Sequence, residues 1–121
     1  MRAALLAVVA CLAACTDTTL GNDTAFRRLV EGFSSYDECI ANGSPNQPCY
    51  QTLTLCSSGS VLMDLDNHQQ EGSYQLDGDS AVLAKFTTAT ILFDLDTATS
   101  SQLPGKPWER VEPTFYGCNN Q

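Results

Sequence analysis

The sequence is poor in basic residues and in the side chains that most metal and catalytic sites use. It has six Lys and Arg against 14 Asp and Glu, a net charge of −8, which argues against binding nucleic acid or anionic lipid headgroups through charge. His68 is its single histidine and no Cys-x-x-Cys pair occurs, which argues against a zinc site. Because no serine or free cysteine lies in a recognisable catalytic motif, we expect a protein that is not an enzyme and uses no cofactor.

The sequence also lacks an apolar run long enough to span a membrane. Its N-terminus has one basic residue, Arg2, followed by the apolar residues 3–14. A helix of that length covers about 18 Å, whereas the hydrocarbon core of a bilayer is roughly 30 Å thick. We therefore expect residues 1–14 to be a signal peptide that directs export.

The end of this run, Leu12-Ala13-Ala14-Cys15, resembles the lipobox of bacterial lipoproteins. The resemblance implies a diacylglycerol thioether and further acylation at Cys15, with cleavage before it. The non-acidic Thr16 implies sorting to the outer membrane, on its periplasmic or surface side. The alternative is an ordinary signal peptide cut after Ala13. The expected organisation is a signal peptide (1–14), a lipidated tether (15–23) and one domain (24–121).

The cysteine count fits an exported, lipidated protein. Cys11 would leave with the signal and Cys15 would carry lipid, so four cysteines remain: Cys39, Cys49, Cys56 and Cys118. An even number in an exported domain predicts two disulfides. Three pairings are open, and we favour Cys39–Cys49 with Cys56–Cys118. Those bridges would contribute about 3 and 4 kcal/mol in the chain-entropy model.

The hydrophobic period changes along the domain. Phe26, Leu29, Val30, Phe33 and Ile40 fall mostly at three- and four-residue steps, which predicts a helix over residues 24–41, ended by Gly43. Beyond it, the pattern alternates and turn formers recur, including Asp77-Gly78. We expect strands near residues 52–55, 60–65, 73–76, 81–87, 90–95, 108–111 and 114–116, with polar loops at 67–72 and 97–107.

These patterns predict a mainly β protein: a small antiparallel β-meander curled into a barrel or half-barrel, with one N-terminal helix. The arrangement is loosely similar to lipocalin-type and lysozyme-inhibitor-type barrels, in architecture only.

Few residues suggest a catalytic or metal-binding role. The pairs Asp64–Asp66, Asp77–Asp79 and Asp94–Asp96 each place two carboxylates on one face of a strand, and Asp64 with Asp66 is the weak candidate for a calcium site. Aspartates are also common where strands enter turns, which is the simpler interpretation. Glu31, Asp37 and Glu38 are expected on the exposed face of the helix, and Trp108, Phe115 and Tyr116 in the core rather than around a pocket.

The function expected from the sequence is a binding or structural lipoprotein of the cell envelope, with a protein or other envelope partner and no nucleic acid. The first alternative is a carrier that holds an apolar ligand inside the barrel. The second is an inhibitor of an exported basic hydrolase such as lysozyme, suggested by the net negative charge.

Overall fold

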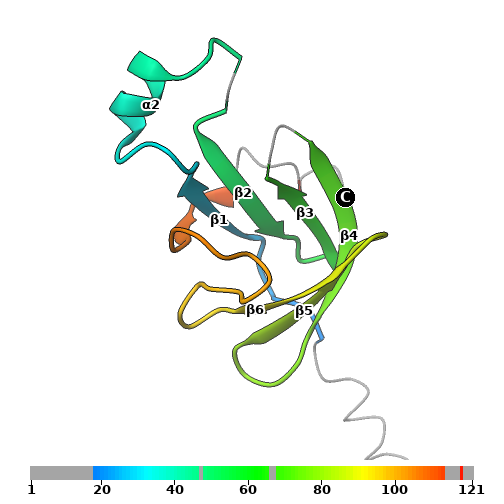
Figure 1. Cartoon of the computed structure of the whole chain (residues 1–121). Helices are drawn as coiled ribbons and strands as arrows, with labels where there is room; N and C mark the ends of the chain where they lie inside the picture. The colour runs from blue at the N-terminus through cyan, green and yellow to red at the C-terminus, as the bar shows by residue number, and fades with distance from the viewer. Residues whose placement is uncertain (1–17, 47, 66–67, 114–117, 119–121) are drawn as a thin grey trace, which may run out of the picture.

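The computed structural model describes residues 18–46, 48–65, 68–113 and 118, and within them the chain forms seven strands and one short helix (Figure 1). Every strand pairs antiparallel with its neighbours, in the sheet order β6-β5-β4-β3-β2-β1-β7. The elements are β1 (Thr24–Leu29), α2 (Tyr36–Asn42), β2 (Tyr50–Leu55), β3 (Ser60–Asp64), β4 (Gln69–Leu76), β5 (Ala81–Lys85), β6 (Thr90–Asp94) and β7 (Glu109–Val111).

The sheet curls into a half-barrel around a shared core, as the sequence predicts. Phe26 on β1 and Phe93 on β6 lie at distant positions in the strand order, yet their ring centroids are 4.9 Å apart. Trp108 packs edge-on against Phe93, with centroids 6.4 Å apart. The buried core consists of Phe26, Leu53, Leu55, Val61, Met63, Tyr74, Val82, Ala84, Phe86, Ile91, Phe93, Leu103 and Trp108.

Residues 95–108, which we call the strap, connect β6 to β7 across the open side of the half-barrel. Thr99 forms a bridge with Asp94, and the Trp108 amide donates to the Ala98 carbonyl at 3.3 Å. The Gln102 side chain accepts a hydrogen bond from the Leu92 amide of β6 at 3.2 Å. The strap therefore satisfies some backbone hydrogen-bonding groups at the edge of β6. Its hydrogen bonds also fix the position at which the chain enters β7.

The predicted helix over residues 24–41 is wrong in its first half, where the chain forms β1. In β1 the side chains of Thr24, Phe26 and Arg28 alternate and are buried, so the inward-facing period is 2. An arginine at one of those inward positions hides the alternation in the sequence. The helix is the shorter α2, which lies between β1 and β2 and ends at Gly43 as predicted.

A second prediction is wrong at residues 69–72, which were expected in a polar turn and instead begin β4. Gln69, Gln70 and Glu71 are exposed, so the strand has no apolar alternation there. Gly72 pairs with Val61, and a Cβ at this position would collide with the Lys85 carbonyl oxygen of β5. The glycine therefore permits a close approach of two strands. The strand expected at 114–116 lies outside the described residues.

Two disulfides join the favoured pairs. Cys39–Cys49 closes the long connection that carries α2, with a sequence separation of 10. Cys56–Cys118 ties the end of β2 to the C-terminal part of the chain, with a separation of 62.

The described part of the chain has no helix long and apolar enough to cross a bilayer.

The half-barrel has two ends, and the chain enters at one of them. Residues 18–23, which we call the leader, lie beside the turns at residues 57–59 and 77–80, at the leader end. β1 then runs to the opposite end, where α2 lies (Figure 1). This α2 end also contains the last part of the strap, which leads into β7 beside β1.

Candidate functional site

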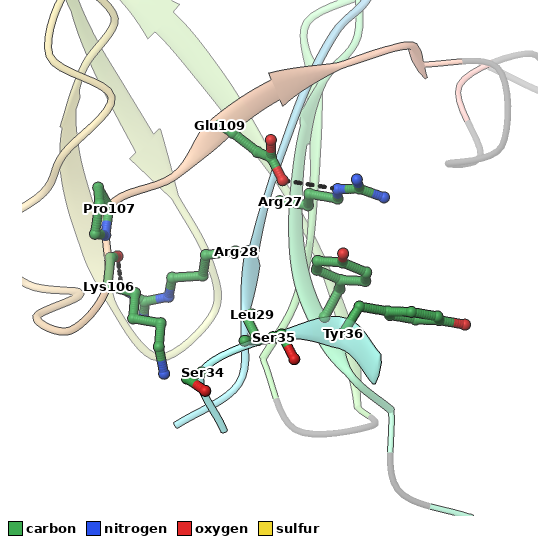
Figure 2. A pocket seen from close by; sticks show the side chains of 10 residues that line it. Arg27, Arg28, Leu29, Ser34, Ser35, Tyr36, Lys106, Pro107 and Glu109 are labelled. Carbon is green, nitrogen blue, oxygen red and sulfur yellow. Dashed lines mark hydrogen bonds and ion pairs between the residues drawn. The ribbon is translucent and has the colours of Figure 1, made fainter. Parts of the chain in front are cut away.

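A surface groove of about 330 Å³ lies at the α2 end, and we call it the α2 groove. Its volume is at the small end of the range for small-molecule sites. It lies between β1, the start of α2, the start of β2 and the end of the strap (Figure 2). Its lining residues are Arg27, Arg28, Leu29, Ser34, Ser35, Tyr36, Tyr50, Lys106, Pro107 and Glu109.

Arg27 projects from the outer face of β1 and begins a row of stacked planar groups. Its Nε donates to Glu109 Oε2 on β7 at 3.1 Å, because the strand register places these two residues opposite each other. Its guanidinium carbon lies 4.1 Å from the centroid of the Tyr50 ring. Tyr50 stacks on Tyr36 at 5.5 Å with 13° between the planes. Tyr36 is 48% exposed at the end of this row, so its ring is available to a ligand.

Arg28 points to the inner face of β1 and holds the strap. Its Nε donates to Gln51 Oε1 at 2.7 Å, and its Nη1 donates to the carbonyls of Leu103 at 2.9 Å and Lys106 at 3.2 Å. Its guanidinium carbon lies 4.5 Å from the centroid of the Trp108 ring. Burial lowers the pKa of Arg28, and the nearby Glu31 carboxylate acts in the opposite direction. Arg28 therefore forms a wall of the groove that its own contacts keep in place.

Lys106 brings a further cation to the groove from the strap. Its Nζ donates to the Val30 carbonyl at 3.1 Å and lies 4.0 Å from Glu31 Oε1. The Glu31 carboxylate also accepts a hydrogen bond from the Lys106 amide at 3.3 Å. The Lys106 side chain remains about one-third exposed, so its ammonium group can still reach a ligand.

The first turn of α2 is fixed by hydrogen bonds to side chains. Ser35 caps the helix, and its Oγ accepts from the Glu38 amide at 3.0 Å. Glu38 Oε1 accepts from the Ser34 amide and hydroxyl, each at 2.7 Å, and these bonds lower the pKa of Glu38. This local order holds Tyr36 over Tyr50 at the edge of the groove.

The α2 groove contains more cationic than anionic side chains, although the protein as a whole is acidic. Arg27, Arg28 and Lys106 face two carboxylates, Glu109 and Glu31, whereas the whole chain has a net charge of −8. Ser35 and the tyrosines add hydroxyl groups, and the tyrosines add aromatic faces. The arrangement suits a small ligand that carries an anionic group on a ring with hydroxyls.

The structure does not gather the residues that the sequence singled out for metal binding. Asp77 and Asp79 are exposed in a turn, and Asp64 is half-buried at the end of β3. Asp94 Oδ1 instead accepts from the amides of Asp96 at 2.8 Å and Thr97 at 3.2 Å, which supports the interpretation of this pair as a turn former. No group of three or more potential metal ligands occurs among the described residues.

Several other residues of interest can also be placed. His68 is exposed just before β4. Glu31 and Asp37 are exposed, as expected, although Glu31 precedes the helix. Trp108 is buried in the core, as favoured, and its Nε1 has no hydrogen-bond partner in the part of the chain that the structure describes. Cys15, Asp66, Phe115 and Tyr116 lie outside the described residues.

Comparison with protein-family models, curated proteins and solved structures finds no match for the chain.

The sequence did not identify the α2 groove, because its parts are far apart in the chain. Arg27 and Glu109 are separated by 82 residues and meet through the pairing of β1 with β7. The available signal was the Arg27-Arg28 pair, two adjacent cations in a chain with only six basic residues. Because this pair was placed on a helix, its division between two faces of a strand was not foreseen.

Proposed function

We propose that the protein is a lipid-anchored binding protein of the bacterial cell envelope, and that the α2 groove binds a small anionic sugar. The observation that carries the ligand assignment is the gathering of three cations and a tyrosine stack in one groove of an acidic chain. The lipobox at Cys15 is the basis for the anchor. The outer membrane is the proposed location, with the groove on the periplasmic or surface side.

The packed interior favours a surface site over the alternative of a carrier with a ligand inside the barrel. Leu53, Leu55, Val61, Val82 and Phe93 are all less than 2% exposed, and they belong to one continuous cluster. A seven-stranded half-barrel of this kind is filled by its own side chains.

The anchor is tested by a Cys15→Ser variant. The unchanged protein should label with palmitate and fractionate with membranes, whereas the variant should do neither and still fold. Loss of labelling and of membrane fractionation supports the lipid anchor. A variant that still labels with palmitate, or an unchanged mature protein without acyl mass, contradicts it.

The ligand is tested through Trp108, the single tryptophan of the chain, which contacts Arg28 in the wall of the groove. We expect galacturonic acid to change its fluorescence saturably and galactose to have no effect. Replacing Arg27 and Lys106 together by Gln should abolish the response. Lys85→Gln is the matched control, because Lys85 is an exposed cation outside the groove. An equal response to galactose, or a response that survives the double substitution, would contradict the assignment.

A further inference from the structure

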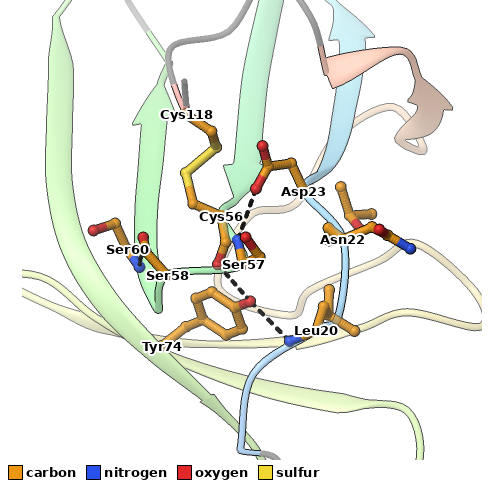
Figure 3. Close-up of a disulfide and its surroundings, with 10 residues drawn as sticks. Leu20, Asn22, Asp23, Cys56, Ser57, Ser58, Ser60, Tyr74 and Cys118 are labelled. Atoms are coloured by element: carbon orange, nitrogen blue, oxygen red, sulfur yellow. Dashed lines mark hydrogen bonds between the residues drawn. A yellow bond between two sulfur atoms is a disulfide. The ribbon is translucent and has the colours of Figure 1, made fainter. Parts of the chain in front are cut away.

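Hydrogen bonds hold the leader to the barrel, and the first of them is at Thr18, where the described chain begins. The Leu76 amide donates to the Thr18 carbonyl at 2.7 Å, and the Leu20 amide donates to the Tyr74 hydroxyl at 3.0 Å. The Tyr74 hydroxyl in turn donates to the Cys56 carbonyl at 2.8 Å (Figure 3). Tyr74 thus links the leader to Cys56, which forms the disulfide with Cys118.

Further contacts hold the rest of the leader against the same end of the sheet. Asp23 Oδ1 accepts from the Ser57 amide at 2.8 Å, and Leu20 packs against the core. The Thr19 methyl group lies 3.5 Å from where a Cβ of Gly59 would stand. Residues 18–23 are therefore part of the folded domain and do not act as a spacer.

Only three residue steps separate Thr18 from Cys15. Fully extended, three residues reach about 10–11 Å. The headgroup layer of one leaflet is roughly 5–8 Å thick. A lipid on Cys15 would therefore hold Thr18 close to the bilayer surface, with almost no slack.

We propose that the leader end of the half-barrel rests on the bilayer and that the barrel stands in one orientation, with the α2 groove facing away from the membrane. This inference rests on the lipid anchor proposed above. β1 leads from the leader end to the groove, and its six residues span about 20 Å, which sets the height of the groove above the surface. The membrane-facing surface consists of the turns at residues 57–59 and 77–80.

The charge of this surface argues against a membrane contact that depends on electrostatic attraction. Asp77 and Asp79 are exposed in one of the membrane-facing turns, and Asp96 is exposed nearby. Such a surface is repelled by anionic headgroups and tolerated by zwitterionic ones. Vesicles of phosphatidylcholine are therefore the appropriate test membrane.

The chain offers a clean chemical test, because its only lysines are Lys85 and Lys106, and Lys106 lies at the α2 end. A Ser58→Lys variant adds one amine in a membrane-facing turn, where Ser58 is exposed. The lipidated variant in phosphatidylcholine vesicles is reacted with a bulky, membrane-impermeant succinimidyl ester. Peptide mass spectrometry then gives the labelling rate at position 58 relative to that at Lys106.

We expect this relative rate to fall several-fold on vesicles compared with the soluble form that also carries Cys15→Ser. Inserting about ten Gly and Ser residues after position 17, which adds roughly 17 Å of mean reach, should restore it. Asp79→Lys is a second sensor at the same end and should behave alike. An unchanged relative rate in protein shown by mass to be acylated would overturn the orientation and leave the anchor intact. Absence of acyl mass would instead overturn the anchor.

Discussion

Arg27 and Arg28 are neighbours in the chain, yet β1 sends their side chains to opposite faces of the sheet. Arg28 is 7% exposed and donates to a side chain and two carbonyls, whereas Arg27 is one-third exposed beside Glu109. Removing a buried charged donor leaves its acceptors unpaired, while a surface ion pair contributes little. The two positions therefore form a matched pair for separating structure from binding.

We expect Arg28→Met to lower the free energy of unfolding by about 2–4 kcal/mol, because the carbonyls of Leu103 and Lys106 lose their donor. Arg27→Met should lower it by less than about 1 kcal/mol. Urea unfolding followed by Trp108 fluorescence measures both. Equal losses in the two variants would show that Arg28 does not hold the strap.

Tyr74 is buried and its hydroxyl joins the leader to the end of β2. Tyr74→Phe removes both hydrogen bonds, and we expect a loss of about 1–3 kcal/mol in unfolding free energy. Hydrogen exchange at the Leu20 amide should also accelerate. If the exchange at Leu20 does not change, the leader is held by its other contacts.

The same tyrosine predicts a pH dependence. Burial raises the pKa of Tyr74 above its ordinary value near 10, the Leu20 amide opposes this, and Asp23 adds to it. Above about pH 10 the unfolded chain loses this proton before the folded one does, so stability falls as pH rises. The contribution is complete below about pH 10 and is lost as pH passes through the folded pKa. Tyr74→Phe should flatten the alkaline limb of the stability curve, and an unchanged limb would assign it to other groups.

At the scale of elements, the two disulfides stabilise different parts of the fold. Cys39–Cys49 closes a short loop around α2, and its neighbours form a small separate cluster with Val30. Cys56–Cys118 closes a loop six times as long and lies against Leu62 of β3. The chain-entropy model therefore ranks the second bridge as the more stabilising.

We expect replacement of Cys56 and Cys118 by Ala to lower the unfolding free energy by about 4 kcal/mol, and replacement of Cys39 and Cys49 by about 3 kcal/mol. Loss of the shorter bridge should raise hydrogen exchange in α2 and leave the central strands protected. The reverse ranking, or loss of protection throughout the sheet in the variant without Cys39–Cys49, would contradict this division.

Gly72 tests whether the close approach of β4 and β5 is required. Gly72→Ala places a methyl group against the Lys85 backbone, and we expect a loss of about 1–3 kcal/mol in thermal or urea unfolding. Gly21→Ala is the control, since among the described residues no atom beyond its two chain neighbours lies within 4 Å of its Cβ position. A neutral Gly72→Ala would mean that the strands can separate locally at little cost.

The elements that could be predicted are those whose side chains follow a simple period. Ile91 and Phe93 are buried on either side of the exposed Leu92, and the Asp77-Gly78 turn forms with Gly78 at φ 93°. β1 could not be predicted because Arg28 occupies an inward position, which its hydrogen bonds to the strap's carbonyls and to Gln51 make favourable. The start of β4 was missed because its residues are polar and its glycine serves a contact with another strand.

At the scale of the whole molecule, the basic residues are unevenly distributed. Three of them, Arg27, Arg28 and Lys106, line the α2 groove, whereas Asp77 and Asp79 are exposed at the leader end. The sequence gives the net charge, whereas the gathering of these cations depends on strand pairing over long distances. The α2 groove was unpredictable for the same reason, although the half-barrel and both bridges were predicted.

This distribution predicts how the protein is retained on membranes. A wash in 1 M salt, where the screening length is about 3 Å, should not release the lipidated protein, because no charge attraction holds it. The Cys15→Ser form should not bind vesicles rich in phosphatidylserine at low salt. Release by salt, or binding of the soluble form to such vesicles, would show an electrostatic contact with the membrane.

The Gln102 side chain, which caps the Leu92 amide, has a consequence for crowding. Proteins confined to a surface meet one another far more often than in solution, and an open sheet margin invites a neighbour's strand to add on. Here the side-chain oxygen of Gln102 already accepts the Leu92 amide at the exposed edge of β6. With the proposed lipid anchor holding many copies on one membrane, this part of the β6 edge would resist pairing with a neighbour's strand.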